Sequence, residues 1–150
     1  MENKKIRNAS HKKFNNIEFK SQLEVLIYKT LLQAGFEPQY ENLKFHIWEG
    51  FKPSIPFFIK DKRTKSIKQD SNKIINITYT PDITFQYKGY LILIEVKPDF
   101  CNDVYPYKRK IFRKYLEENC KNAIFAQIGT KKILLEFIDI LKNLNDYEEK

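Results

Sequence analysis

Residues 79–97 read YTPDITFQYKGYLILIEVK, in which two largely apolar runs flank Lys88 and Gly89. Glycine in such a pair is typical of a two-residue hairpin turn, because it adopts a positive φ angle at little steric cost. The pattern therefore predicts two antiparallel strands, one over Asp82–Tyr87 and one over Tyr90–Lys97. This hairpin decides how the neighbouring side chains are arranged.

The register of the hairpin brings two carboxylates face to face. If Tyr87 pairs with Tyr90, Asp82 lies directly opposite Glu95, with Cβ atoms about 4.5–5.5 Å apart. A bulged three-residue loop would instead leave the pair diagonal but still close. Like charges directly opposite each other destabilise a sheet, and a buried unpaired carboxylate is costly. A divalent cation would compensate, and two hard oxygen ligands favour Mg²⁺ or Mn²⁺.

Lys97 lies two residues beyond Glu95, so it projects from the same face of the strand, while Val96 points into the core. A partly desolvated lysine beside a metal has a lowered pKa. It can help to deprotonate a water, or steady the attacking hydroxide and the scissile phosphate. Carboxylates for a metal together with a lysine form a set typical of phosphodiester hydrolysis. The plainer alternative is an exposed hairpin end at which Lys97 neutralises Glu95.

The remaining sequence predicts helices on both sides of this hairpin. Apolar periodicity indicates helices over residues 21–34, 105–118 and 130–145, and strands over residues 40–48, 74–79 and 123–128. This order predicts an α/β fold in which helices flank a mixed sheet.

Two segments stand outside that pattern. Residues 1–18 form a basic arm, which is either a frayed terminus or a segment that lies along phosphates. Residues 49–73 form a long, charged connection that either carries function or is simply mobile. We expect residues 19–150 to form a single domain.

Composition limits the partners and the compartment. The net charge of +8, from 27 Lys and Arg against 19 Asp and Glu, favours a polyanionic partner, most commonly nucleic acid, although a merely lysine-rich surface would give the same charge. Two isolated cysteines and two scattered histidines argue against a zinc site or a disulfide framework. The apolar stretches are too short for a membrane span, and the charged N-terminus lacks a signal core. We therefore expect an intracellular, cytoplasmic protein with no membrane partner.

Several further residues are candidates for the site. Glu24 follows Ser21 at capping-box spacing, so it is either a helix cap or an additional ligand near the metal. In the helix from Tyr105, Lys108 falls within the predicted apolar arc and either reaches the scissile phosphate or snorkels outward. Arg109 and Arg113 on the polar side of that helix belong either to a solvated face or to a contact with the DNA backbone. Lys62 and Arg63 in the long connection are further candidates for DNA contact.

The hairpin motif resembles that of the PD-(D/E)XK nuclease superfamily, because Pro81-Asp82 is followed after twelve residues by Glu95-Val96-Lys97. It is similar in particular to the phage-type branch, which carries a Y-T-P-D strand start and an acidic residue in an upstream helix. The basic segment 108–114 also looks similar. Phage Holliday-junction-cleaving endonucleases and the nuclease subunits of some transposases share this arrangement. One departure is Pro98, where a glycine often follows the lysine in that branch.

The resemblance covers residues 19–128 and implies an αβββαβ restriction-endonuclease-like core with Mg²⁺-dependent DNA endonuclease activity in a prokaryotic or phage-infected cell. Branched DNA, such as a Holliday junction, is one implied substrate. By the resemblance, the metal is held by Asp82, Glu95 and the Val96 carbonyl, Lys97 serves the water, and Glu24 contributes through the metal or the water. The alternative is a DNA-binding subunit of a phage or mobile-element complex that does not cleave by itself. Cutting both strands would favour a homodimer.

Overall fold

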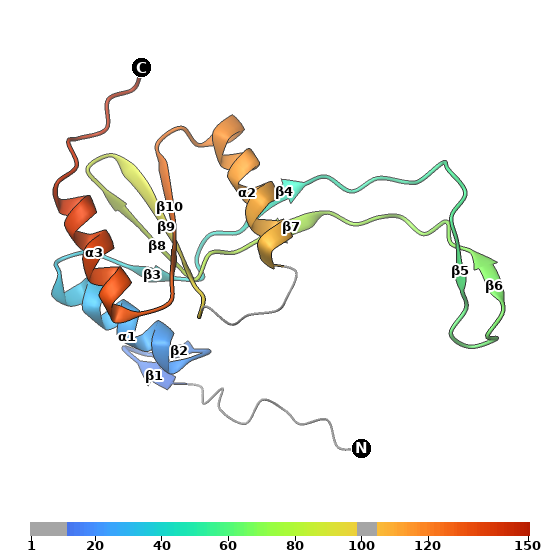
Figure 1. Cartoon of the computed structure of the whole chain (residues 1–150), viewed down its shortest axis with the longest axis horizontal. Coiled ribbons are helices and arrows are strands. Elements are labelled where there is room, and N and C mark those ends of the chain that lie inside the picture. The colour runs from blue at the N-terminus through green and yellow to red at the C-terminus, as the bar shows by residue number, and fades with distance from the viewer. Residues whose placement is uncertain (1–11, 99–104) are drawn as a thin grey trace. The chain divides into compact units, whose positions relative to one another are not determined.

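The chain divides into two compact units in the computed structural model, which describes residues 12–98 and 105–150 (Figure 1). The core unit combines the chain up to Lys44 with the chain from Thr80 onward. The inserted unit, Phe45–Tyr79, leaves and rejoins the core unit between those positions. The range predicted to form a single domain, residues 19–150, thus contains both units, and the long connection at residues 49–73 forms most of the second.

The core unit is a mixed α/β structure, as expected. Its four-stranded sheet has the order β10-β9-β8-β3, with β10 parallel to β9 and the other neighbours antiparallel. The strands are β3 (Gln39–Tyr40), β8 (Ile83–Tyr87), β9 (Tyr90–Val96) and β10 (Ala123–Ile128). The helices are α1 (Gln22–Gln33), α2 (Tyr105–Asn119) and α3 (Lys131–Lys142).

The β8–β9 hairpin has the predicted register. Lys88 and Gly89 form the turn with φ angles of 50° and 81°, and Tyr87 pairs with Tyr90. Positive φ at both turn positions matches the right-handed twist of the flanking strands, so the two-residue turn needs no bulge. The pairing continues to Ile83 opposite Ile94, which fixes the side-chain alternation along both strands.

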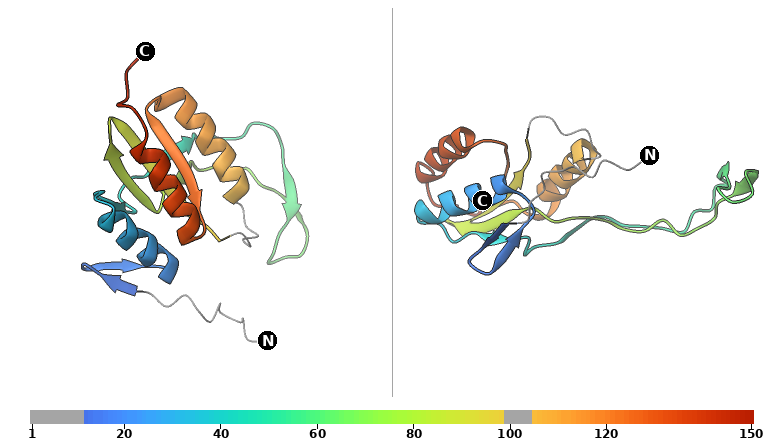
Figure 2. Two further views of the ribbon diagram at one scale, coloured as in Figure 1. Left: turned by 60° about the vertical axis from the view of Figure 1, so that its left-hand side comes forward. Right: turned by 90° about the horizontal axis from the view of Figure 1, so that it is seen from below.

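The two faces of the sheet are covered by different helices. One face carries Ile92, Ile94 and Val96 of β9, which join the buried core formed with α1 and α3. On the opposite face, Phe125 of β10 packs edge-on against Phe112 of α2, with ring centroids 5.1 Å apart. Helices α2 and α3 accordingly lie on either side of β10 (Figure 2, left). Odd-numbered β9 residues, including Glu95, therefore share the α2 face of the sheet.

The N-terminal segment is more ordered than the sequence predicted. Strands β1 (Lys12–Phe14) and β2 (Ile17–Phe19) form an antiparallel hairpin. Phe19 is fully buried, and Phe14 and Ile17 pack against the core. The prediction of a basic arm over residues 1–18 is therefore wrong for residues 12–18, where aromatic and aliphatic side chains dock the segment. Residues 1–11 lie outside the described part of the chain.

The inserted unit is built from paired strands. It contains β4 (Phe45–Trp48), β5 (Phe58–Lys60), β6 (Ile67–Gln69) and β7 (Ile77–Tyr79). Strand β4 pairs with β7 and β5 pairs with β6, both antiparallel, and an isolated bridge joins Phe51 to Ile74. The single strand predicted over residues 40–48 is thus two strands, β3 and β4, which belong to different units. Within the described ranges, no helix has the length and apolar character needed to cross a membrane.

Candidate active site

Asp82 is fixed at the start of β8 by both its backbone and its side chain. Its carbonyl oxygen accepts a hydrogen bond from the Glu41 N–H at 2.8 Å, and its Oδ2 accepts one from the Val96 N–H at 2.7 Å. The side chain therefore leans across to β9, on the side where the register places Glu95. Glu95 is itself only 9% exposed. The structure thus brings the two predicted carboxylates together in a largely desolvated position.

Electrostatics at this pair disfavour a second negative charge. Burial and then repulsion from Glu95 raise the pKa of Asp82 to about 8, while the hydrogen bond from the Val96 N–H opposes the rise. Glu24 and Glu41 add smaller repulsions. Without a cation, Asp82 therefore keeps its proton over much of the range in which a free aspartate is ionised.

The donor set suits a hard divalent cation that keeps much of its water. In residues 12–98 and 105–150 no group of three or more His, Cys, Asp or Glu side chains could hold a metal, so the site offers the Asp82 and Glu95 carboxylates alone. Mg²⁺ is commonly bound by one or two carboxylates and retains several water ligands. The oxygen donors and the mutual repulsion of the pair therefore fit Mg²⁺ or Mn²⁺ and argue against softer metals.

Lys97 extends β9 by one residue on the face of Glu95. Its N–H donates to the Ile128 carbonyl at 3.0 Å, which continues the β9–β10 ladder up to Pro98. Its half-buried side chain places Nζ 4.9 Å from the centre of the Tyr105 ring. Gly129 passes so close that an added Cβ would lie 2.7 Å from the Lys97 carbonyl oxygen, so only glycine fits there.

Glu24 fulfils part of the capping role and also faces the core of the site. The Glu24 N–H donates to Ser21 Oγ at 3.2 Å, which confirms Ser21 as the N-cap. The Glu24 carboxylate accepts from the Lys20 N–H at 3.0 Å and from the Tyr40 hydroxyl at 2.6 Å, and it is 7% exposed. This buried carboxylate also contributes to the raised pKa of Asp82, so it acts on the site electrostatically as well as lying in the first turn of α1.

In helix α2 the cation that contacts the sheet is Arg109, whereas the sequence placed Lys108 on the inner side of the helix. Arg109, expected on the polar side, donates to Gln127 Oε1 at 2.7 Å and lies over the Tyr105 ring. Lys108, placed within the apolar arc by the sequence, is half-buried, and Arg109 is half-buried as well. The residues that the helix buries are Tyr105, Phe112 and Leu116. Gln127 pairs in register with Glu95, so Arg109 reaches the strand position beside the carboxylates.

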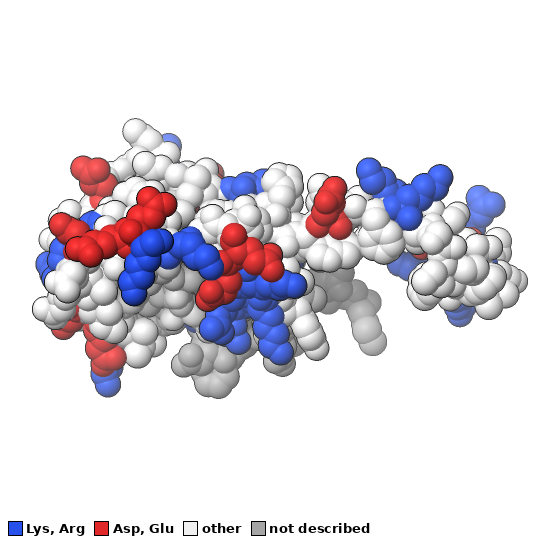
Figure 3. Space-filling model, turned by 90° about the horizontal axis from the view of Figure 1, so that it is seen from above, with Lys and Arg blue, Asp and Glu red and all other residues white. Residues whose placement is uncertain are grey.

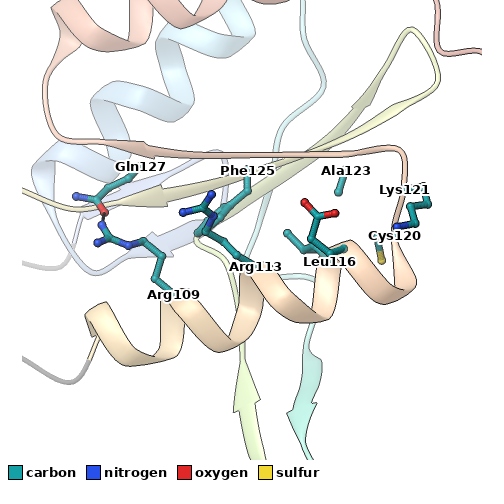
Figure 4. A pocket seen from close by; sticks show the side chains of 9 residues that line it. Arg109, Arg113, Leu116, Cys120, Lys121, Ala123, Phe125 and Gln127 are labelled. Carbon is teal, nitrogen blue, oxygen red and sulfur yellow. Dashed lines mark hydrogen bonds between the residues drawn. The ribbon is translucent and has the colours of Figure 1, made fainter.

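A basic cavity of about 440 Å³ runs between α2 and β10 from this point (Figure 4). Its walls combine guanidinium and ammonium groups with apolar surface. The lining residues are Arg109, Arg113, Leu116, Glu117, Cys120, Lys121, Ala123, Phe125 and Gln127. Arg109 and Arg113, both predicted to contact DNA, thus share one groove that ends beside the strand neighbour of Glu95.

The other two predicted DNA contacts are not part of this site. Lys62 and Arg63 are exposed in the loop between β5 and β6 of the inserted unit. They are therefore considered with that unit.

Tyr40, Gln127 and Tyr105 were not predicted as site residues. The sequence does mark Gln127, because it is the one polar residue in the otherwise apolar strand Ala123–Ile128. It does not mark Tyr40, because the hydrogen bond from Tyr40 to Glu24 joins positions that only the folded chain brings together.

No family model, curated protein or solved structure matches this chain. Its function therefore has to be inferred from the residues of the site.

Proposed function

We propose that this chain is a metal-dependent DNA endonuclease that hydrolyses phosphodiester bonds, with Asp82, Glu95 and Lys97 as its catalytic centre. One observation carries the proposal: the partly buried Asp82, just before β8, is held against the buried Glu95 of β9, and Lys97 follows two residues after Glu95. A structural role gives no reason to keep two carboxylates in such repulsion. A cation that binds between them gives that reason.

Each residue would have a separate task. Asp82 and Glu95, together with the Val96 carbonyl that the nuclease resemblance implies, would hold the ion. When bound, Mg²⁺ or Mn²⁺ supplies Lewis-acid stabilisation of the phosphate and a more acidic water. The Lys97 ammonium group, oriented over Tyr105, would hold the attacking water and the scissile phosphate. Glu24 would orient water from the α1 side while it caps the helix.

DNA is the proposed substrate because of the charge around the site. The chain carries a net charge of +8, and Arg109 and Arg113 line a groove beside Glu95. Guanidinium groups in such a groove are suited to phosphate oxygens of the bound strand. In the core unit, the four-stranded sheet and its helices follow the order α1, β3, β8, β9, α2, β10, which is the order of the αβββαβ core that the resemblance implies, so we extend the proposal to the PD-(D/E)XK superfamily and its phage-type branch. Branched DNA and a homodimer that cuts both strands are part of the same proposal.

Cleavage assays on four DNA forms test this function. Purified protein is incubated with supercoiled, linear, single-stranded and four-way-junction DNA, in Mg²⁺, Mn²⁺ or EDTA, beside the Asp82→Asn variant. We expect nicking or cutting with either metal, none in EDTA and none by the variant. Cleavage that persists in EDTA, or no cleavage of any form, contradicts the proposal. Tight DNA binding without cleavage would instead identify a DNA-binding subunit.

A further inference from the structure

The inserted unit leaves large apolar side chains in water. Ile55, Ile67 and Ile75 are 82%, 76% and 78% exposed, and most of the exposed large apolar residues in the described ranges lie between Phe45 and Tyr79. Two paired strands without a covering layer cannot bury an apolar face, and exposed patches of this kind mark interaction surfaces. The exposed apolar side chains of the inserted unit therefore indicate a surface that binds a partner.

The charge of the inserted unit identifies the kind of partner. Residues 45–79 contain seven Lys or Arg and three acidic residues. Lys and Arg side chains gather over the β5–β6 end of the unit (Figure 3). Two of the acidic residues serve local structure: Asp61 Oδ1 accepts from the Arg63 N–H at 2.7 Å, and Asp70 Oδ1 from the Asn72 N–H at 2.9 Å. The surface that remains is cationic, which matches a polyanion and disfavours a second copy of the same unit.

The loop at the end of β5 holds its cations in a defined turn. Asp61 donates its N–H to the Ser66 carbonyl at 2.8 Å and accepts from the Lys65 N–H at 3.0 Å. Its carboxylate also approaches Lys68 Nζ at 3.5 Å. Lys65 adopts a φ of 63°, which turns the chain back into β6. Lys62 and Arg63 are consequently displayed at the tip of a closed hairpin.

We propose that the inserted unit is a two-stranded ribbon that lies in the major groove of duplex DNA. The major groove, about 12 Å wide, admits such a ribbon in undeformed duplex, whereas the minor groove is about 6 Å wide and proteins that bind it frequently kink the DNA. Lys62, Arg63 and Lys65 would contact phosphates, and apolar side chains such as Ile67 would pack against sugars and thymine methyl groups. The inference rests on DNA as the substrate of the proposed function, and it adds that the substrate includes a duplex arm outside the active site.

Binding without cleavage tests the ribbon. The full chain carrying Asp82→Asn is titrated in EDTA with a 30-base-pair duplex and with a single strand, at several salt concentrations. The ribbon variant adds Lys62→Ala, Arg63→Ala and Lys65→Ala, and the matched control adds Lys131→Ala, Lys132→Ala and Lys142→Ala on α3. We expect the ribbon variant alone to lower duplex affinity, with a salt slope smaller by about 2–3, since each phosphate contact contributes about 0.9.

Small molecules that occupy one groove of the duplex test which groove the ribbon enters. Methyl green, which occupies the major groove, should weaken duplex binding by the parent protein and should have much less effect on binding by the ribbon variant. Distamycin, which occupies the minor groove, should weaken duplex binding by neither protein. Unchanged duplex affinity of the ribbon variant, an equal loss in the α3 control, or displacement by distamycin instead of methyl green would overturn the proposal. The proposal would also be overturned if the chain is a dimer and the double variant Ile55→Ser, Ile67→Ser is a monomer with unchanged DNA affinity. The exposed apolar side chains would then serve dimerisation and not DNA binding. Because no step requires cleavage, an inactive catalytic centre leaves this result standing.

Discussion

The position of Lys97 is set by its backbone. The ladder bond to Ile128 and the close passage of Gly129 hold the end of β9, while Tyr105 lies beside the ammonium group. The backbone of Lys97 is thus held on two sides, and its ammonium group lies over an aromatic ring. The proposed catalytic role and the plainer alternative of an ion pair at a hairpin end predict different effects of removing the amine.

Lys97→Ala should abolish cleavage and leave DNA binding nearly intact. Loss of a group that stabilises the attacking water and the phosphate should slow cleavage by about 10²–10³-fold or more, because such interactions strengthen in the transition state. Single-turnover cleavage and duplex affinity are measured on the same preparation, with Lys131→Ala on α3 as the control. Normal cutting by Lys97→Ala would show that the catalytic role is wrongly assigned.

The two roles of Glu24 can be separated by substitution. Glu24→Gln keeps an oxygen that accepts from the Lys20 N–H and the Tyr40 hydroxyl, but it removes the charge. We expect cleavage to fall while the melting temperature barely moves. Ser21→Ala is the matched control, because it removes the N-cap, costs about 1 kcal/mol of stability, and leaves the Glu24 carboxylate unchanged. If Glu24→Gln cleaves like wild type, Glu24 serves the helix alone.

At the scale of elements, the β8–β9 hairpin contains an electrostatic cost that depends on pH. The pKa of Asp82 is raised to about 8 in the folded chain, whereas an aspartate in the unfolded chain titrates near 3.9. Between these values the folded state binds more protons than the unfolded state, so the free energy of unfolding falls as pH rises. The favourable contribution is complete below about pH 4 and is lost as the pH passes about 8.

We therefore expect chemical denaturation in EDTA to show a wild-type stability that declines between about pH 4 and pH 8. Asp82→Asn should remove this slope and exceed wild type near pH 8, because asparagine keeps an acceptor for the Val96 N–H but cannot ionise. A variant with the same pH slope as wild type would mean that other groups cause it.

The hairpin was the most predictable part of the site, whereas the contacts of α2 with the sheet were not predictable. The register followed from local turn chemistry at Lys88 and Gly89, so the approach of Asp82 to Glu95 could be read from sequence spacing. The contact of Arg109 with Gln127 depends instead on where α2 packs against β10, a later strand. For that reason the sequence did not reveal that Arg109 reaches the sheet.

Long-range contacts explain the other failures. The bond between Tyr40 and Glu24 and the split between β3 and β4 both depend on where the inserted unit leaves the core unit, which no local pattern records. In α3, Leu134 is buried while the adjacent Ile133 is exposed. Two adjacent aliphatic residues leave this choice to tertiary packing.

At the scale of the whole molecule, a cation in the site should stabilise the fold. A ligand that binds only the folded state adds about 2.7 kcal/mol at a hundredfold excess over its Kd. Mg²⁺ or Mn²⁺ should therefore raise the melting temperature of wild type, and Asp82→Asn should erase most of that increase while melting higher than wild type in EDTA. Thermal melts of both proteins, in EDTA and in saturating metal, measure the effect. An Asp82→Asn protein that melts lower in EDTA and keeps its full metal response would place the site elsewhere.

The place at which the inserted unit joins the core unit has a consequence for how such a protein can change. The Glu41 N–H and the Asp82 carbonyl, just outside the two ends of the insertion, are already joined by a hydrogen bond of 2.8 Å. The core unit thus closes the loop by itself, and each doubling of loop length costs only about 0.6 kcal/mol. Insertions of different length and sequence should therefore be tolerated at this junction. Exchange of the inserted unit, by evolution or design, would therefore change what the chain can contact while Asp82 and Glu95 stay in place.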